Sequence, residues 1–120
     1  MSQKAPAVVK FAILCIDCHD ASGLAQFWAD LLGGTVELDD DSDAIVRTSS
    51  IRLDFLQVPE PKTIKNRLHV DIAATDVAAA TEQALALGAT LADDVYDGGR
   101  WQVLRDPEGN EFCLLPPELS

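Results

Sequence analysis

The side chains best suited to chemistry lie in the second half of the chain. His69 and Asp71 stand two residues apart, and Cys113 lies near the carboxyl end. Residues two apart in a strand point to the same face, so His69 and Asp71 are expected side by side. An imidazole has an unperturbed pKa of about 6.5, which lets it act as acid, base or hydrogen-bond donor. His69 is therefore the candidate catalytic residue. Both residues also have a purely structural interpretation. His69 could be a cavity histidine that Asp71 or a carbonyl holds in place, and Cys113 could be a small buried hydrophobic residue.

Cys15, Cys18 and His19 formally match the haem-attachment pattern C-x-x-C-H, and the two cysteines match a redox pair. In a strand, residues three apart face opposite sides, so the two sulfurs would diverge. Haem attachment normally implies export, and residues 1–4 lack the basic stretch of a secretory signal. We therefore expect a buried Cys15, a loop Cys18 and free thiols in a cytosolic protein.

Composition limits the function classes. A chain of 120 residues with 48% hydrophobic content is the size of one domain with a core of its own. Nine basic and twenty acidic residues give a net charge of -11, which disfavours nucleic acid and anionic membrane surfaces as partners. The acids at 39–43 and 93–97 are expected to form solvated turns, because their spacing matches no calcium loop. Hydrolase, NTPase and nicotinamide motifs are also lacking from the sequence.

The elements that must position these side chains form a repeat. In the first half, strand 8–17 precedes a helix with Asp20 as N-cap and Gly33 at its end, and three strands follow at 35–38, 44–47 and 51–58. In the second half, strand 67–74 precedes a helix that is capped at Thr75 or Asp76 and ends at Gly88. Three strands follow it, at 90–95, 101–105 and 111–115. The order βαβββ occurs twice, which predicts two copies of one unit that pack together.

The last two strands form a predicted hairpin around the turn at 106–110. If Arg105 lies opposite Glu111, then Val103 lies opposite Cys113. One face then carries Trp101, Val103 and Cys113, and the other carries Leu104, Phe112 and Leu114. Two apolar faces suit a sheet with helices on one side and a closed cavity on the other. Trp101 is either a platform for a flat ligand or core filling at a strand end.

Three stretches carry a resemblance to a known family: residues 20–28 (DASGLAQFW), 67–71 (RLHVD) and 106–113 (DPEGNEFC). The chain resembles the vicinal oxygen chelate superfamily, the glyoxalase and bleomycin-resistance fold, and within it the small glyoxalase-like domains. The resemblance implies an α+β fold of paired βαβββ modules whose curved mixed sheets surround a cavity. Module one is expected at about 7–58, a linker at 59–66 and module two at 67–117, all in one domain of residues 1–120.

Metal enzymes of this family take one ligand from the first and one from the last strand of each module. Here the resemblance places Ile13, which cannot ligate a metal, at the first position, and Asp54 or Leu56 at the second. Module two offers His69 and, where glutamate is usual, Cys113. Because this set is incomplete, no tightly held metal is expected. If a divalent metal is bound, its ligands are expected to be His69, Cys113 and Asp54.

Two functions remain open. The first is a protein that binds a small, partly apolar organic molecule in the cavity. The second is a metal-dependent lyase, isomerase or dioxygenase that uses His69. A homodimer is expected from the family's habit of completing cavities across chains and from the apolar faces of the outer strands. The expected ligand-binding residues are Ile13, Asp54, Asp71, Trp101 and Cys113.

Overall fold

A computed structural model of the chain describes residues 5–39 and 41–120. Residues 1–4 and Asp40, considered above for export and for the acidic turn, lie outside the described residues. In chain order the elements are β1 (Leu14–Cys18), α1 (Ala21–Leu32), β2 (Thr35–Leu38), β3 (Ala44–Arg47), β4 (Arg52–Gln57), β5 (Val70–Ala73), α2 (Val77–Leu87), β6 (Thr90–Leu91), β7 (Gln102–Arg105), β8 (Glu111–Leu115) and the 3-10 helix η1 (Pro117–Leu119). None of the helices in these ranges is long and apolar enough to cross a membrane.

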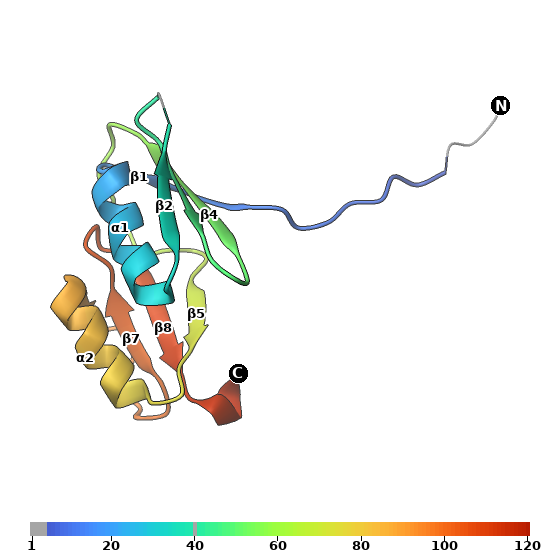
Figure 1. Cartoon of the computed structure of the whole chain (residues 1–120). Coiled ribbons are helices and arrows are strands. Elements are labelled where there is room, and N and C mark those ends of the chain that lie inside the picture. The colour runs from blue at the N-terminus through green and yellow to red at the C-terminus, as the bar shows by residue number, and fades with distance from the viewer. Residues whose placement is uncertain (1–4, 40) are drawn as a thin grey trace.

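The strands form two four-stranded sheets, in the orders β1-β4-β3-β2 and β5-β8-β7-β6. In each sheet the first strand runs parallel to the last, and the other pairs are antiparallel. We call the first sheet with α1 module one and the second sheet with α2 module two. Both helices lie on the same side of the sheets, so each sheet has a helix-covered face and a helix-free face (Figure 1). The prediction of an α+β fold with paired βαβββ modules is confirmed.

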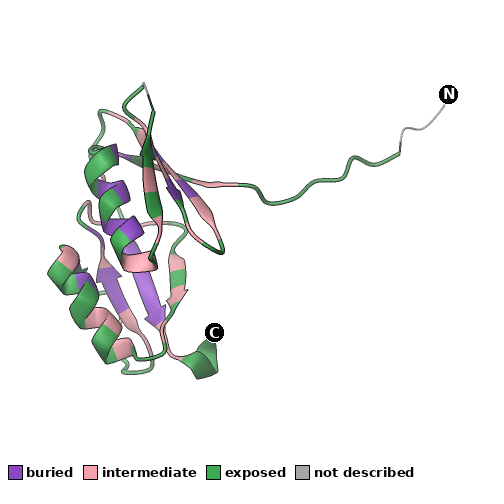
Figure 2. Cartoon of the chain, in the orientation of Figure 1, coloured by how far each residue is buried: buried purple, intermediate pink, exposed green. Residues whose placement is uncertain are grey.

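Local signals in the sequence fix both helices. The Asp20 carboxylate accepts a hydrogen bond from the Gly23 amide at 3.2 Å, and Asp76 caps α2 in the same way through the Ala79 amide. Gly33 and Gly88 end the helices with φ of 74° and 117°, a region that side chains other than glycine rarely adopt. Figure 2 shows the buried stripe along α1, which contains Ala21, Leu24, Ala25, Phe27, Trp28 and Ala29.

One hydrophobic core extends through both modules. The Trp28 ring on α1 lies 4.9 Å from the Phe112 ring on β8, and Phe27 lies 5.4 Å from Trp28, all with edge-on geometry. Such aromatic pairs add about 0.5–1.5 kcal/mol each beyond the burial of their area. Module one is therefore fixed against module two by the helix-covered faces of both sheets.

The hairpin has the predicted register. Arg105 pairs with Glu111 and Val103 pairs with Cys113. Leu104, Phe112 and Leu114 belong to the main core, whereas Val103 and Cys113 belong to a second cluster on the helix-free face. The prediction of two apolar faces is confirmed, and it places Cys113 on the face away from the helices.

Several predicted strands are shorter in the structure, and β5 covers only Val70–Ala73 of the strand predicted at 67–74, so His69 lies just before it. The first strand begins at Leu14 rather than Val8, because its partner strand β4 pairs with it only from that residue onward. Residues 5–13 run away from the rest of the chain (Figure 1), with Val8 98% and Phe11 74% exposed. The strand predicted at 90–95 ends at Leu91, since the Val95 amide turns back to the Ala92 carbonyl.

The expected placement of two cysteines, a buried Cys15 and a Cys18 in a loop, is wrong. Cys15 is exposed, whereas Cys18 is buried with a relative exposure of 3%. The cause is strand alternation: Cys18 shares the core-facing side of β1 with Ile16, and Cys15 points to the helix-free side. All three cysteines are free. Cys15 and Cys18 lie on opposite faces of β1, as predicted.

Candidate functional site

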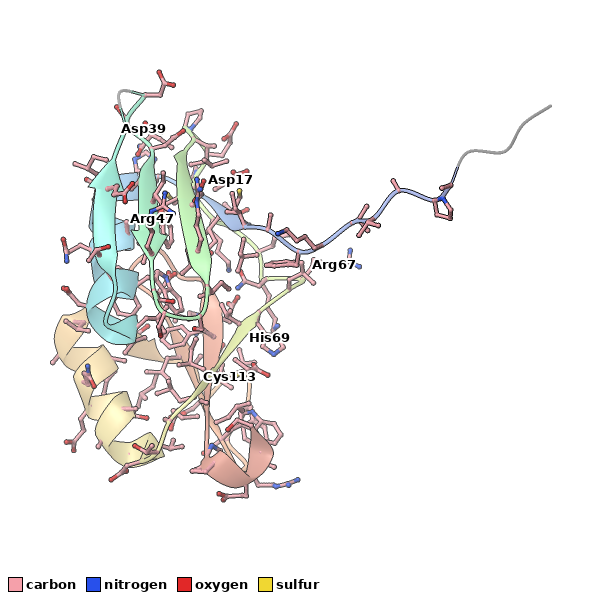
Figure 3. All side chains as sticks on the ribbon, turned by 45° about the vertical axis from the view of Figure 1, so that its right-hand side comes forward. Asp17, Asp39, Arg47, Arg67, His69 and Cys113 are labelled. Carbon is pink, nitrogen blue, oxygen red and sulfur yellow. The ribbon has the colours of Figure 1, made fainter. Side chains whose placement is uncertain are left out.

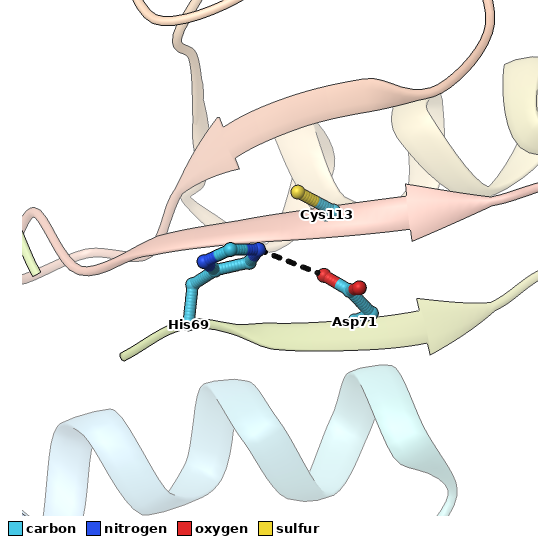
Figure 4. A group of neighbouring side chains, drawn as sticks. All are labelled: His69, Asp71 and Cys113. Carbon is cyan, nitrogen blue, oxygen red and sulfur yellow. Dashed lines mark ion pairs between the residues drawn. The ribbon is translucent and has the colours of Figure 1, made fainter. Parts of the chain in front are cut away.

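The helix-free face of module two brings His69, Asp71 and Cys113 together. Asp71 lies opposite Cys113 in the parallel β5–β8 ladder, and His69 directly precedes β5. One ligand atom from each of the three side chains lies within 4.8 Å of the others. Figure 4 shows the three side chains gathered across the two strands, and Figure 3 places His69 and Cys113 in the whole molecule. We call these three residues the module-two cluster.

An ion pair orders the exposed part of this cluster. His69 Nε2 lies 3.2 Å from Asp71 Oδ1, and the two side chains are 47% and 46% exposed. Burial, and then the nearby Asp71 carboxylate, raises the pKa of the Cys113 thiol to about 11. The thiol is therefore protonated at neutral pH in the metal-free chain. A cysteine nucleophile needs the opposite environment, so the cluster does not resemble the Cys-His pair of a thiol hydrolase.

Trp101 lies on the same face but beyond the cluster. Its ring stacks on Tyr96 with a centroid distance of 4.1 Å and an interplanar angle of 7°. It packs with Val103 and Cys113 in the second hydrophobic cluster, and the Arg100 guanidinium lies 5.9 Å from its ring centre. One face of the indole is thus already covered by Tyr96.

The predicted residues of module one lie apart from the module-two cluster. Ile13 is half-buried directly before β1. Asp54 lies opposite Cys15 in the β1–β4 ladder, and Arg52 donates two hydrogen bonds to its carboxylate, at 2.8 and 2.9 Å. The two modules have the same pairing pattern: Cys15 lies opposite Asp54 in module one, and Asp71 lies opposite Cys113 in module two. The residue of module one that corresponds to Cys113 is therefore Asp54 and not Leu56. A four-residue metal site drawn from both modules does not fit, because Ile13 has no donor and Arg52 already binds Asp54.

A cavity of about 470 Å³ lies between the first strands of the two modules. Its size is within the range typical of small-molecule sites. His69, Cys15 and Asp17 are among its lining residues. The other lining residues come from both modules. Five are apolar (Leu14, Ile16, Trp28, Leu68 and Val70) and four are polar (Asn66, Asp106, Asn110 and Glu111). We call this space the junction cavity.

A neighbouring cavity of about 450 Å³ shares Ile16, Trp28 and Val70 with the junction cavity and includes Asp71. The predicted site residues are therefore divided: His69 and Asp71 each line one of the two spaces, whereas Trp101 and Cys113 line neither. Sequence reasoning missed Trp28 and Leu68 as cavity residues. Leu68 was recoverable, because it directly precedes His69 in the family-like stretch.

Glu111 is one of the polar residues that line the junction cavity. Its side chain is only 4% exposed, and its carboxylate meets Lys62 at 3.2 Å, Arg105 at 3.2 Å and the Asn66 amide at 2.9 Å. Burial alone would raise its pKa, but the Asn66 amide, Lys62 and Arg105 outweigh it and lower the pKa to about 2. Glu111 is thus a structural anion that ties the linker to β8, with its oxygens already committed.

The turn after β7 forms hydrogen bonds to α1 and to the residues just before it. The buried Asp106 carboxylate accepts hydrogen bonds from the Trp28 indole at 3.0 Å and from the Asn110 side chain at 2.9 Å. Burial raises the pKa of Asp106, and these hydrogen bonds oppose that shift. Glu108 accepts from the amides of His19 and Asp20 at 2.6 and 2.7 Å, so this turn also holds the start of α1.

Residues 13–115 match the model of the glyoxalase-like domain family. The chain belongs to this family. The match spans both modules, the junction cavity and the module-two cluster. None of the curated proteins matches the chain.

Solved structures of similar fold include an antibiotic-binding protein and an antibiotic resistance protein. A bleomycin-binding protein from bleomycin-producing Streptomyces verticillus, solved with copper(II)-bleomycin, is 25% identical, with 91% of this chain and 98% of that chain covered and a TM-score of 0.57. The fosfomycin resistance protein FosX from Mesorhizobium loti is 12% identical, with 91% and 92% covered and a TM-score of 0.72. A glyoxalase/bleomycin resistance protein from Albidiferax ferrireducens T118 is 20% identical, with 88% and 97% covered and a TM-score of 0.66.

Proposed function

We propose that this glyoxalase-like protein binds a small, partly apolar organic molecule in the junction cavity. The observation that carries the proposal is the cavity itself: apolar side chains from both modules face it, and His69 offers an exposed hydrogen-bonding group at its edge. Pockets with mostly apolar walls and a few polar groups are typical of small-molecule sites. The bleomycin-binding protein of similar fold supports a binding role for this chain.

Titration with N-phenyl-1-naphthylamine, a neutral probe that fluoresces in apolar surroundings, tests this function. We expect saturable binding to the wild type and at least about tenfold weaker binding to Leu68→Asp, because an apolar ligand that packs against this position would remove water from the new carboxylate. Leu68 is 84% exposed, so this change leaves the core intact. The matched control is Leu85→Asp on α2, which lies outside the cavity lining and should bind like the wild type. Equal binding by all three proteins would refute the proposed location.

The second candidate function is a metal-dependent lyase, isomerase or dioxygenase in which His69 is the catalytic acid, base or hydrogen-bond donor. The contact between His69 and Asp71 supports it, because a carboxylate partner 3.2 Å away orients the imidazole. For any substrate that the protein turns over, His69→Ala should abolish turnover and Cys18→Ser should leave it intact. Full activity in His69→Ala would reject this role.

We also propose that the protein acts as a homodimer. Val8 and Phe11 in the extended amino-terminal segment are 98% and 74% exposed. Leu38 and Leu91 on the outer strands β2 and β6 are 66% and 45% exposed. Apolar surface of this extent favours contact with a second copy. Sedimentation should give twice the chain mass, and Phe11→Asp should shift the protein toward monomer. A monomer mass for the wild type at micromolar concentration would contradict this proposal.

A further inference from the structure

We propose that His69, Asp71 and Cys113 bind one thiophilic divalent cation, with zinc the expected ion, and that all three protein ligands come from module two. In residues 5–39 and 41–120 this is the only group of three or more histidine, cysteine, aspartate and glutamate side chains close enough to hold a metal ion. The proposal does not depend on binding of an organic molecule in the junction cavity.

The chemistry of the three donors selects the class of metal. A cysteine sulfur and an imidazole nitrogen are favourable ligands for zinc, whereas magnesium, calcium and manganese prefer oxygen ligands. Only Asp71 offers oxygen. We therefore expect the cluster to discriminate strongly against magnesium, even though the chain carries a net charge of -11 that attracts any cation.

The backbone places the donors so that small side-chain movements bring them to bonding distance. The β5–β8 ladder holds Asp71 opposite Cys113, and the ion pair holds His69 Nε2 3.2 Å from Asp71 Oδ1. Ligand atoms around a tetrahedral zinc ion are about 3–3.7 Å apart, given bond lengths of about 2.0–2.3 Å. His69 and Asp71 are half-exposed and free to adjust, whereas Cys113 is 7% exposed and fixed by its apolar neighbours.

This ligand set differs from the one that the family resemblance implies. The resemblance offered Asp54 as the third ligand, but Arg52 binds both Asp54 oxygens. Asp71 replaces it from the same strand pair as Cys113. Three protein ligands leave the fourth position of a tetrahedral ion to water or to a donor atom of a bound molecule. Since His69 also lines the junction cavity, the site is built at the edge of that cavity.

Cobalt(II) titration of the chelator-treated protein tests the site without any assay of activity. Cobalt occupies zinc sites, and a cysteine ligand gives it a thiolate charge-transfer absorption band. We expect one cobalt ion per chain with this band, displacement by one equivalent of zinc, and no displacement by excess magnesium. Absence of one-to-one binding in the folded wild type would overturn the proposal.

Variants assign the ligands. Cys113→Ser should lose the thiolate band, and Asp71→Asn should keep the band but weaken zinc binding at least about tenfold. Asp71 is half-exposed, so its variant should fold even if Cys113→Ser does not, and circular dichroism checks both. The matched control is Cys18→Ser, which changes a thiol of module one outside the junction cavity and should leave the band and the affinity unchanged. A band that persists in folded Cys113→Ser, or wild-type affinity in Asp71→Asn, would also overturn the proposal.

Discussion

Replacing Trp28 with phenylalanine tests whether the turn of module two and the helix of module one form one structural unit. The Trp28 ring is 2% exposed and packs edge-on against Phe27 and Phe112. Its indole N–H donates to the buried Asp106 carboxylate at 3.0 Å. Trp28→Phe keeps an aromatic ring in the core but removes this hydrogen bond and part of the packed volume.

The expected loss of unfolding free energy is large. A hydrogen bond to a charged group contributes about 1.5–3 kcal/mol, and the smaller ring leaves a partly filled space that costs about 1–2 kcal/mol more. Asp106 keeps its hydrogen bonds from Asn110, so its carboxylate is not left without partners. We therefore expect a total loss of about 2.5–5 kcal/mol.

Urea denaturation followed by far-ultraviolet circular dichroism measures this loss. The matched control is Trp101→Phe, which keeps an aromatic ring over Tyr96 and should cost less than about 1 kcal/mol. In a double-mutant cycle, Trp28→Phe and Asp106→Asn should show a coupling free energy of about 1 kcal/mol or more. Equal losses for the two tryptophan variants, or a coupling near zero, would refute the role assigned to this contact.

Two further predictions concern the carboxylates that hold the modules together. Glu111→Gln should lower the unfolding free energy by about 2–3 kcal/mol at pH 7. The folded-state pKa of Glu111 lies below its unfolded value, so this contribution is present above about pH 4.5 and is lost as the pH falls toward about 2. In denaturation at several pH values, the stability difference between wild type and variant should therefore shrink across that window. A constant difference would contradict the assignment. Glu108→Ala removes an acceptor for the amides at the start of α1 and should cost about 1–2 kcal/mol by the same assay, whereas Glu118→Ala on the exposed 3-10 helix should cost less than about 0.5 kcal/mol.

Local sequence signals predicted much of the fold. The helix caps at Asp20, Gly33 and Gly88 depend on side chains and backbone preferences within a few residues, so they are readable from the chain alone. The register of the last hairpin follows from its turn in the same way, and with it the placement of Cys113 on the helix-free face.

The candidate site depended on longer-range contacts, which the sequence pattern does not contain. Asp71 becomes a neighbour of Cys113 only through the parallel β5–β8 register, across more than forty residues. The contact of Glu108 with the start of α1 joins residues almost ninety positions apart. Arg52 and Asp54 share one strand face, so their ion pair was accessible from spacing, but only the structure shows that it removes Asp54 from the site.

Amide chemical shifts show where a small molecule binds on the protein. We would record two-dimensional ¹⁵N–¹H spectra of the protein during titration with N-phenyl-1-naphthylamine. Binding in the junction cavity should give saturable shifts concentrated at residues 14–17, 66 and 68–70, which line the cavity from β1 and from the approach to β5. Shifts confined to α2 and the β6–β7 edge, or no saturable shifts in the folded protein, would contradict it.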